Sequence, residues 1–163
     1  MACNVFLGLG SNVGDRIKFI NDAADAINRD EKCRLIKSAS YYETTPYGNV
    51  KQQNFINTVF LVETEFNLLD LFDFLKEIEA KLGRKKNSVR WGPREIDVDI
   101  LFYNNLIYNS DKLSIPHKEI LQRDFVIVPL IEIAPDFIHP VLNKRLDEID
   151  LGGIEKHIIR KLN

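Results

Sequence analysis

The amino-acid sequence predicts an α+β fold, in which an antiparallel sheet carries its helices on one face. Three observations support this prediction. The chain has 163 residues, which suits one domain, and its composition of 45% hydrophobic and 28% charged residues is typical of a globular protein. Strand-like and helix-like stretches alternate in the order strand, helix, strand, strand, helix, strand. No repeat, low-complexity tract or linker interrupts the chain, so we expect a single domain over residues 1–163.

The first part of the chain predicts a strand, a helix and a second strand. Residues 5–9 form a short apolar run, which the turn residues at 10–15 end. Apolar residues between 17 and 27 recur at the spacing of one helix face, and Asp15 is the expected N-cap. Residues 36–42 favour a strand, and residues 44–49 favour a loop.

The middle of the chain predicts a long strand, a helix and an acidic strand. Residues 55–64 are rich in β-branched and aromatic side chains, which favours a strand. Apolar residues between 68 and 82 follow helical spacing, and Gly83 is the expected helix stop. Residues 95–102 begin with strict alternation of acidic and aliphatic side chains, which indicates a strand with one acidic face.

The last third of the chain predicts smaller elements. We expect a hairpin around Asn104 and Asn105, a loop as far as Pro116, and short elements at 123–130. The whole order of elements resembles the ferredoxin-like βαββαβ arrangement, with C-terminal additions beyond it.

Charge, cysteine content and hydropathy narrow the functional classes. The chain has 22 Lys and Arg against 24 Asp and Glu, a net charge of -2, which disfavours a general nucleic-acid coat but leaves a local basic patch possible. Cys3 and Cys33 have no metal-binding spacing and predict free thiols. No apolar run approaches the roughly 20 residues of a membrane span, and no leader pattern begins the chain. We therefore expect a cytoplasmic monomer with neither membrane nor nucleic-acid partners.

The most informative pattern is the pair Asp97 and Asp99. Residues two apart on a strand point to the same side, about 7 Å apart at Cα, so the two carboxylates repel each other unless a positive charge neutralises them. Magnesium, which prefers oxygen ligands, would do so. Because Ile96, Val98 and Ile100 would face the core, the acidic face is expected to be open. A solvated outer face of the sheet is the alternative.

A basic stretch directly precedes this pair. Residues 84–94 contain five cations and no acid, an arrangement that suits a magnesium–polyphosphate site. A solvated basic loop is the alternative, and Trp91 within it could anchor a core or stack on a flat ring. The glycines between Gly8 and Gly14 match neither a P-loop nor the dinucleotide fingerprint, so a structural turn is at least as plausible there as ligand contact.

Together these motifs resemble the 6-hydroxymethyl-7,8-dihydropterin pyrophosphokinase family of folate biosynthesis. The resemblance runs from about residue 5 to 135, and its most specific block is 90–100; the other motifs are Gly8–Asn12, Phe55–Asn57, Pro116–His117 and Arg123-x-Phe125. It implies transfer of the terminal pyrophosphoryl group of ATP to the hydroxymethyl oxygen of a reduced pterin, leaving AMP.

The resemblance also implies roles for individual residues. Asp97 and Asp99 would hold two magnesium ions, and Arg84 and Arg94 would act with them in catalysis. The ATP co-substrate would be bound by Glu79, Arg84, Lys86, Arg90, Trp91, Arg94, Ile100, Lys112, Ser114, His117 and Arg123. The pterin would be bound by Thr44, Thr45, Pro46, Tyr47, Gly48, Phe55, Asn57, Asp97 and Phe125.

Within the pterin site, Phe55 and Phe125 match the rings that sandwich the pterin, and Asn57 would read its hydrogen-bonding edge. Without the resemblance, ordinary core packing would explain both phenylalanines equally well. Some positions depart from the family pattern: Phe55 replaces a frequent tyrosine, Thr45 a frequent proline, and lysine replaces other residues at Lys76, Lys86, Lys112 and Lys118. The resemblance further implies that loops 48–53 and 84–91 close over the substrates.

Two other classes of function remain open from the residues alone. One is a non-catalytic module that binds a small effector, because this fold serves many functions. The other is a magnesium-dependent nucleic-acid binder that uses the basic loop, which the acidic pair and the net charge disfavour.

Overall fold

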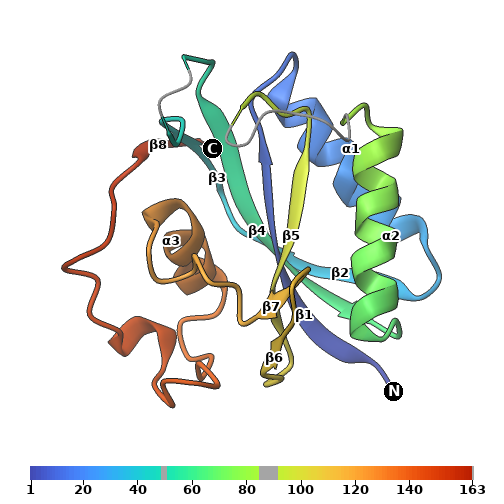
Figure 1. Cartoon of the computed structure of the whole chain (residues 1–163), viewed down its shortest axis with the longest axis vertical. Helices are drawn as coiled ribbons and strands as arrows, with labels where there is room; N and C mark the ends of the chain where they lie inside the picture. The colour runs from blue at the N-terminus through green and yellow to red at the C-terminus, as the bar shows by residue number, and fades with distance from the viewer. Residues whose placement is uncertain (49–50, 85–91, 163) are drawn as a thin grey trace.

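The computed structural model describes residues 1–48, 51–84 and 92–162. Within these ranges it has an α+β fold built around one main antiparallel sheet (Figure 1). The elements are β1 (Cys3–Ser11), α1 (Arg16–Arg29), β2 (Cys33–Ser38), β3 (Tyr41–Thr44), β4 (Phe55–Thr64), α2 (Leu68–Lys81), β5 (Asp97–Tyr103), β6 (Tyr108–Asn109), β7 (Ser114–Ile115), α3 (Asp124–Ile133), a 3-10 turn (Leu146–Glu148) and β8 (Ile158–Leu162).

The strands of the main sheet follow the order β5-β1-β4-β3-β8, and β2 also pairs with β4. Every pairing is antiparallel. The long central strands β1 and β4 run side by side over their whole length, from Cys3 opposite Thr64 to Ser11 opposite Ile56. This register decides which side chains meet across the sheet.

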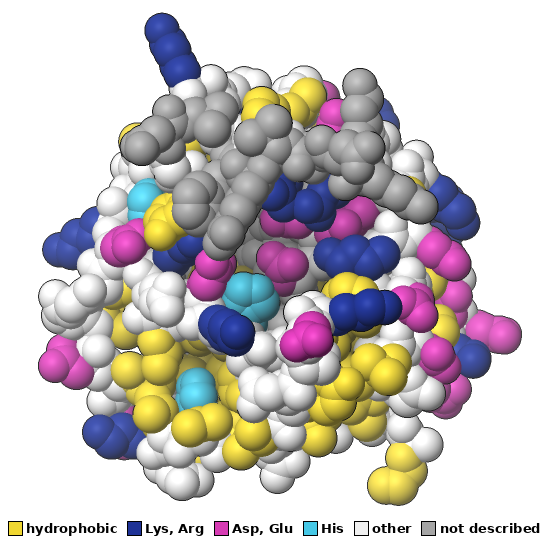
Figure 2. Space-filling model, viewed as in Figure 1, with side chains coloured by type: hydrophobic (Ala, Val, Ile, Leu, Met, Phe, Trp, Pro, Cys, Tyr) yellow, Lys and Arg dark blue, Asp and Glu magenta, His cyan; other side chains and the backbone are white. Residues whose placement is uncertain are grey.

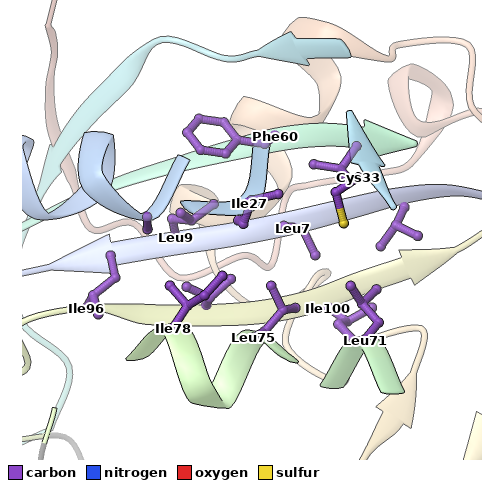
Figure 3. Close-up of a cluster of buried hydrophobic side chains, with 14 of the residues drawn as sticks. Leu7, Leu9, Ile27, Cys33, Phe60, Leu71, Leu75, Ile78, Ile96 and Ile100 are labelled. Carbon is purple, nitrogen blue, oxygen red and sulfur yellow. The ribbon is translucent and has the colours of Figure 1, made fainter. Parts of the chain in front are cut away.

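Helices cover both faces of this sheet, with α1 and α2 on one face and α3 on the other (Figure 1). The core under α1 and α2 contains Leu7, Leu9, Ile27, Leu75 and Ile100 and neighbouring apolar side chains (Figure 3). Each such fully buried side chain contributes about 1.5–3 kcal/mol of hydrophobic stabilisation. The prediction of helices on one face is correct for the two helices of the repeating strand–helix pattern, but α3 adds a helix on the opposite face.

A second core forms between the sheet and α3. It contains Phe6, Val59, Leu101, Ile127 and Leu130, all of them buried. Neighbouring residues such as Val59 and Phe60 therefore enter different cores, as the alternation of side chains along a strand requires.

Local sequence signals explain where the helices begin and end. The Asp15 side chain accepts a hydrogen bond from the Lys18 amide, which confirms the predicted N-cap of α1. Asn67 caps α2 in the same way through the Asp70 amide. Gly83 follows α2 with a φ of 107°, a conformation that favours glycine and that ends the helix as predicted.

Two sequence predictions about strands are wrong. Residues 36–42 do not form one strand, because the chain breaks between β2 and β3 and the carbonyls of Ala39 and Ser40 accept the Thr58 hydroxyl instead. The turn at Asn104 exists, with a φ of 47°, but the hairpin lies between β6 and β7. The strand predicted over 55–64 matches β4.

Two further properties follow from the described residues. Both cysteines are free thiols, as predicted, and Cys33 is buried while Cys3 is half-buried. In residues 1–48, 51–84 and 92–162, no helix has the length and apolar character needed to cross a membrane.

A carboxylate on α3 attaches this helix to the start of β3. Glu132 Oε1 accepts the Tyr42 hydroxyl, and Glu132 Oε2 accepts both the amide and the hydroxyl of Ser40, at 2.8 and 2.9 Å. Burial alone would raise the pKa of Glu132, but these hydrogen bonds outweigh it and lower the pKa. The folded state therefore favours the ionised carboxylate.

We expect Glu132→Gln to lower the free energy of unfolding by about 1 kcal/mol at pH 7, because an amide offers one acceptor oxygen where the carboxylate uses two. Since the folded-state pKa is lowered, this stabilisation is complete above the ordinary value of 4.5 and is lost as the pH falls through the folded-state value. Urea unfolding between pH 3 and 8 would show the difference in the free energy of unfolding between Glu132→Gln and the unsubstituted protein decrease at low pH. The exposed Glu31→Gln is the control. A difference that increases towards acid pH would contradict the assignment.

Candidate active site

A cavity of about 360 Å³ opens on the α3 side of the sheet, where β1 and β3 end and β4 and β5 begin. Figure 2 shows basic, acidic and histidine side chains gathered around the middle of this face. Twelve of the predicted site residues line the cavity: Thr44, Thr45, Tyr47, Phe55, Asn57, Arg84, Arg94, Asp97, Asp99, His117, Arg123 and Phe125.

Two glycines of β1 form the floor of this cavity. Gly10 lies opposite Asn57 on β4 and Asp97 on β5, and Gly8 lies opposite Asp99. A Cβ atom at Gly10 would lie 2.4 Å from Asn57 Oδ1, closer than any real contact. Gly8 lies in the strand as predicted, but Gly10, expected in the turn that ends it, also lies within β1, and the absence of a side chain at both positions gives the cavity its depth.

The acidic pair faces this cavity, as predicted. Asp97 and Asp99 line it, whereas the intervening Val98 is 1% exposed and packs into the opposite core. Burial, followed by the negative charge of Asp97, raises the pKa of Asp99 to about 7. Bringing the two carboxylates together is therefore costly in the unliganded protein, and a cation beside them would relieve that cost.

Two arginines already compensate part of this charge. Arg84 Nη1 donates to Asp97 Oδ1, and Arg94 Nη1 lies 3.5 Å from Asp97 Oδ2. Asp97 is therefore held between the two guanidinium groups that the sequence predicts to bind phosphate.

Glu79 links Arg84 and Lys76 to the backbone of β5. Its carboxylate is buried, accepts the Val98 amide at 2.7 Å and pairs with Arg84 at 2.9 Å and with Lys76 at 3.2 Å. Glu79 lines neither cavity, and its contacts hold Arg84 and the start of β5 in position.

A second cavity of about 420 Å³ adjoins the first between α2, β5 and the β6–β7 hairpin. The two cavities share Lys76, Asp99, His117 and Glu119. Three further residues predicted to bind nucleotide lie in the second cavity: Ile100, Lys112 and Ser114. A ligand with a phosphate chain could therefore extend from one cavity into the other.

His117 stands where the two cavities meet. Burial lowers the pKa of its imidazole, so the neutral ring is favoured. Its Nδ1 accepts a hydrogen bond from the Glu119 amide at 3.2 Å, which leaves the ring proton on Nε2. His117 can therefore donate one hydrogen bond to a phosphate or sugar oxygen without carrying a charge.

The opposite wall of the first cavity is aromatic. The Arg123 guanidinium lies 3.7 Å from the centre of the Tyr47 ring and 5.8 Å from that of Phe125. Its Nε is buried and has no hydrogen-bond partner among the described residues. The Asn57 amide donates to the buried Thr44 hydroxyl at 2.8 Å, which fixes its orientation beside Phe55.

Some predicted residues do not reach either cavity, and some lining residues were not predicted. Pro46, Gly48 and Glu79 lie outside both linings. Lys86, Arg90 and Trp91 lie outside the described residues, as do 49–50 and 85–91 of the two loops expected to close.

The structure adds Lys76 and Glu119 to the site. Lys76 lies three residues before Glu79, and Glu119 lies four residues before Arg123, and each forms an ion pair with that residue. This spacing to predicted site residues is the one sequence signal that could have indicated them. The apolar lining residues Val59, Leu101 and Val126 carry no signal that separates them from core residues.

Comparison with known proteins gives a consistent result. The family model described as 7,8-dihydro-6-hydroxymethylpterin-pyrophosphokinase (HPPK) matches residues 6–135. The 2-amino-4-hydroxy-6-hydroxymethyldihydropteridine pyrophosphokinase of Aquifex aeolicus is 41% identical over 144 residues, which cover 88% of each chain. The bifunctional protein FolKE of Lactococcus lactis is 37% identical over 96% of this chain but only 45% of its own length.

Solved structures share the fold. Wild-type HPPK-DHPS of Plasmodium falciparum with pteroate superposes with a TM-score of 0.70 at 19% identity, over 90% of this chain and 41% of that one. An HPPK-DHPS structure in complex with substrates gives a TM-score of 0.69 at 17% identity and covers 42% of that chain. The chain therefore spans less than half the length of these two-part proteins and corresponds to one part of them.

We expect Gly10→Ala to lower the free energy of unfolding by about 1–3 kcal/mol, because the new methyl group must displace the Asn57 side chain. Urea unfolding would measure the loss. Gly153→Ala is the matched control, since a Cβ atom there meets nothing within 4 Å. Equal stability of the two variants would show that Asn57 can move without cost.

Proposed function

The chain belongs to the 7,8-dihydro-6-hydroxymethylpterin-pyrophosphokinase (HPPK) family, the pyrophosphokinases of folate biosynthesis, and we propose that it transfers the pyrophosphoryl group of ATP to the hydroxymethyl oxygen of 6-hydroxymethyl-7,8-dihydropterin. The products are the pterin diphosphate and AMP. One observation supports this proposal above the others: a carboxylate pair between arginines shares a single cavity with an aromatic and amide-lined pocket.

The aromatic end of the cavity suits the pterin. Phe55 and Phe125 supply flat apolar surfaces, and Asn57 and Thr44 supply hydrogen-bonding groups whose orientation is already fixed. A ligand without a matching polar edge would leave the Asn57 amide carbonyl unpaired, which gives the pocket its selectivity.

The charged end and the second cavity suit ATP. Arg84, Arg94 and Lys76 lie where a polyphosphate would pass the acidic pair. His117 then donates from Nε2, and the adenosine lies in the second cavity against Ile100, Lys112 and Ser114. One arginine side chain can bind two phosphate oxygens at once. Arg84 and Arg94 can therefore release Asp97 and bind the phosphates of the nucleotide instead.

The donor set at β5 suits two magnesium ions. Within the described residues no group of three or more His, Cys, Asp or Glu side chains is placed to hold a metal, so Asp97 and Asp99 would act together with phosphate oxygens. Bound magnesium would lower the pKa of the pterin hydroxyl and neutralise phosphate charge. The raised pKa of Asp99 supports this assignment, because it reflects a buried carboxylate beside the negative charge of Asp97, which a bound cation would stabilise.

In the reaction the pterin hydroxyl releases its proton to solvent, and its oxygen forms a bond to the β-phosphorus of ATP. The bond between that phosphorus and the bridging oxygen to the α-phosphate breaks, and AMP leaves with the electron pair. Arg84 and Arg94 hold the phosphates in position and stabilise the charge that develops on the leaving group, while Glu79 fixes the position of Arg84.

The remaining proposals concern the whole chain. We propose that residues 1–163 form one monomeric pyrophosphokinase domain of ferredoxin-like type, in which α3 and the C-terminal segment are additions. A non-catalytic effector-binding module would not need the two carboxylates of Asp97 and Asp99 together. A nucleic-acid binder would show a steep dependence on salt.

Incubation with ATP, magnesium and 6-hydroxymethyl-7,8-dihydropterin tests the function directly. We expect AMP and the pterin diphosphate in equal amounts, resolved by ion-exchange chromatography. ADP as the sole nucleotide product would indicate ordinary phosphoryl transfer and would refute the proposal.

We expect Asp97→Ala and Asp99→Ala to reduce kcat by at least about 100-fold, the order of loss when one electrostatic contact to a transition state is removed. The fold should survive, because removing one of two repelling carboxylates leaves the apolar cores intact. Steady-state kinetics and thermal unfolding would measure both effects, with the exposed Asp73→Ala as control. Full activity in either variant would remove the metal-binding role.

A further inference from the structure

The C-terminal segment returns the chain to the wall of the first cavity. β8 pairs with β3, and this pairing brings His157 beside Thr45, just beyond the end of β3. Residue 157 lies outside the range 6–135 that the family model matches. The sequence analysis assigned no role to it.

The backbone of this segment is anchored on both sides. The buried Asp124 carboxylate, in the first turn of α3, accepts the amides of His157 and Ile158 at 2.9 and 3.0 Å. On the other side the Thr45 amide donates to the His157 carbonyl at 2.9 Å. His157 therefore connects the start of α3 to the loop after β3.

The His157 ring contacts three residues that line the cavity. Its Nδ1 lies 3.0 Å from Thr45 Oγ1, and its ring centre lies 5.6 Å from that of Phe125 and 5.8 Å from that of Tyr47. The ring itself does not line the cavity, and its side chain is 14% exposed. It therefore acts on a ligand only through these neighbours.

A second contact fixes how the ring hydrogen-bonds. Nε2 lies 3.2 Å from Glu155 Oε2, and because a carboxylate accepts only, Nε2 carries the ring proton in the neutral form. Nδ1 is then an acceptor, and the Thr45 hydroxyl must donate to it. The Thr45 oxygen is left to accept a hydrogen bond from an N–H group of a ligand in the cavity.

We infer that His157 is a positioning residue for the pterin site, which holds Thr45, Tyr47 and Phe125 in place and sets the Thr45 hydroxyl as an acceptor. This inference rests on the proposed function. The C-terminal segment then contributes to pterin affinity, although none of its described residues, up to 162, lines the cavity. ATP binding should change much less than pterin binding, because Arg84, Arg94 and the second cavity lie on the side of β5, and of the described arginines expected to bind ATP it is Arg123 that lies on the aromatic wall.

Steady-state kinetics of His157→Ala test this inference, with the exposed neighbour Lys156→Ala as the matched control. We expect KM for the pterin to rise about tenfold in His157→Ala while KM for ATP stays within about twofold, since one hydrogen bond and two ring contacts are lost on the pterin side only. Lys156→Ala should match the unsubstituted protein in both constants.

Two conservative variants separate the hydrogen bond from ring packing and carry the test if His157→Ala does not fold. His157→Asn can keep an acceptor near Thr45, and His157→Phe keeps the ring, so each should recover part of the pterin affinity. Titration calorimetry with the pterin alone should rank the variants in the same order of pterin affinity, and it requires no turnover.

The outcomes separate the inference from the proposed function. If the unsubstituted protein forms no pterin diphosphate, the proposed function fails. If it does so but KM for the pterin is unchanged in the variants, or rises equally with KM for ATP, the positioning role of His157 is wrong.

Discussion

The antiparallel register of β5, β1 and β4 is the constraint on which the candidate site depends. It places Asp97, Gly10 and Asn57 in one row across the sheet and Asp99 beside Gly8. Each row therefore has a side chain at both ends and open space in the middle. A shift of one residue would turn these side chains into the opposite core and bring Leu7 or Leu9 to the cavity floor. The long β1–β4 pairing and the two apolar cores oppose such a shift, so fold stability and site geometry have the same origin.

Internal ion pairs compensate part of the charge of the site before any ligand binds. Glu79, Asp97 and Asp99 face Lys76, Arg84 and Arg94, and most of these side chains are at least partly buried. A polyphosphate with its cations would exchange partners within this network rather than add charge to it. Most of the free-energy cost of removing these charged side chains from water therefore arises when the protein folds, not when the substrate binds. The substrate then meets hydrogen-bond donors that are already oriented.

Sequence reasoning predicted the local features and missed the long-range ones. The strand over residues 55–64, the Asp15 cap and the orientation of Asp97 and Asp99 follow from periodicity, which acts over a few residues. The role of Gly10 depends on strands distant in the sequence, so no local pattern could show it.

Contacts between residues distant in the sequence also explain the other differences between the predicted and the observed structure. Glu119 and His157 reach the site through turns and edge pairing, and α3 reaches the second face of the sheet through packing. Roles for individual residues came from the family resemblance, because spacing alone left solvated surfaces as an equal alternative.

The pairing of β8 with β3 has a consequence for solubility. β3 would otherwise present unpaired amides and carbonyls along its outer side, a surface on which another chain could add a strand. β8 covers it and carries the exposed Arg160 and Lys161, whose charges disfavour further strand addition. A chain without the β8 pairing of residues 158–162 would expose this edge and become prone to self-association.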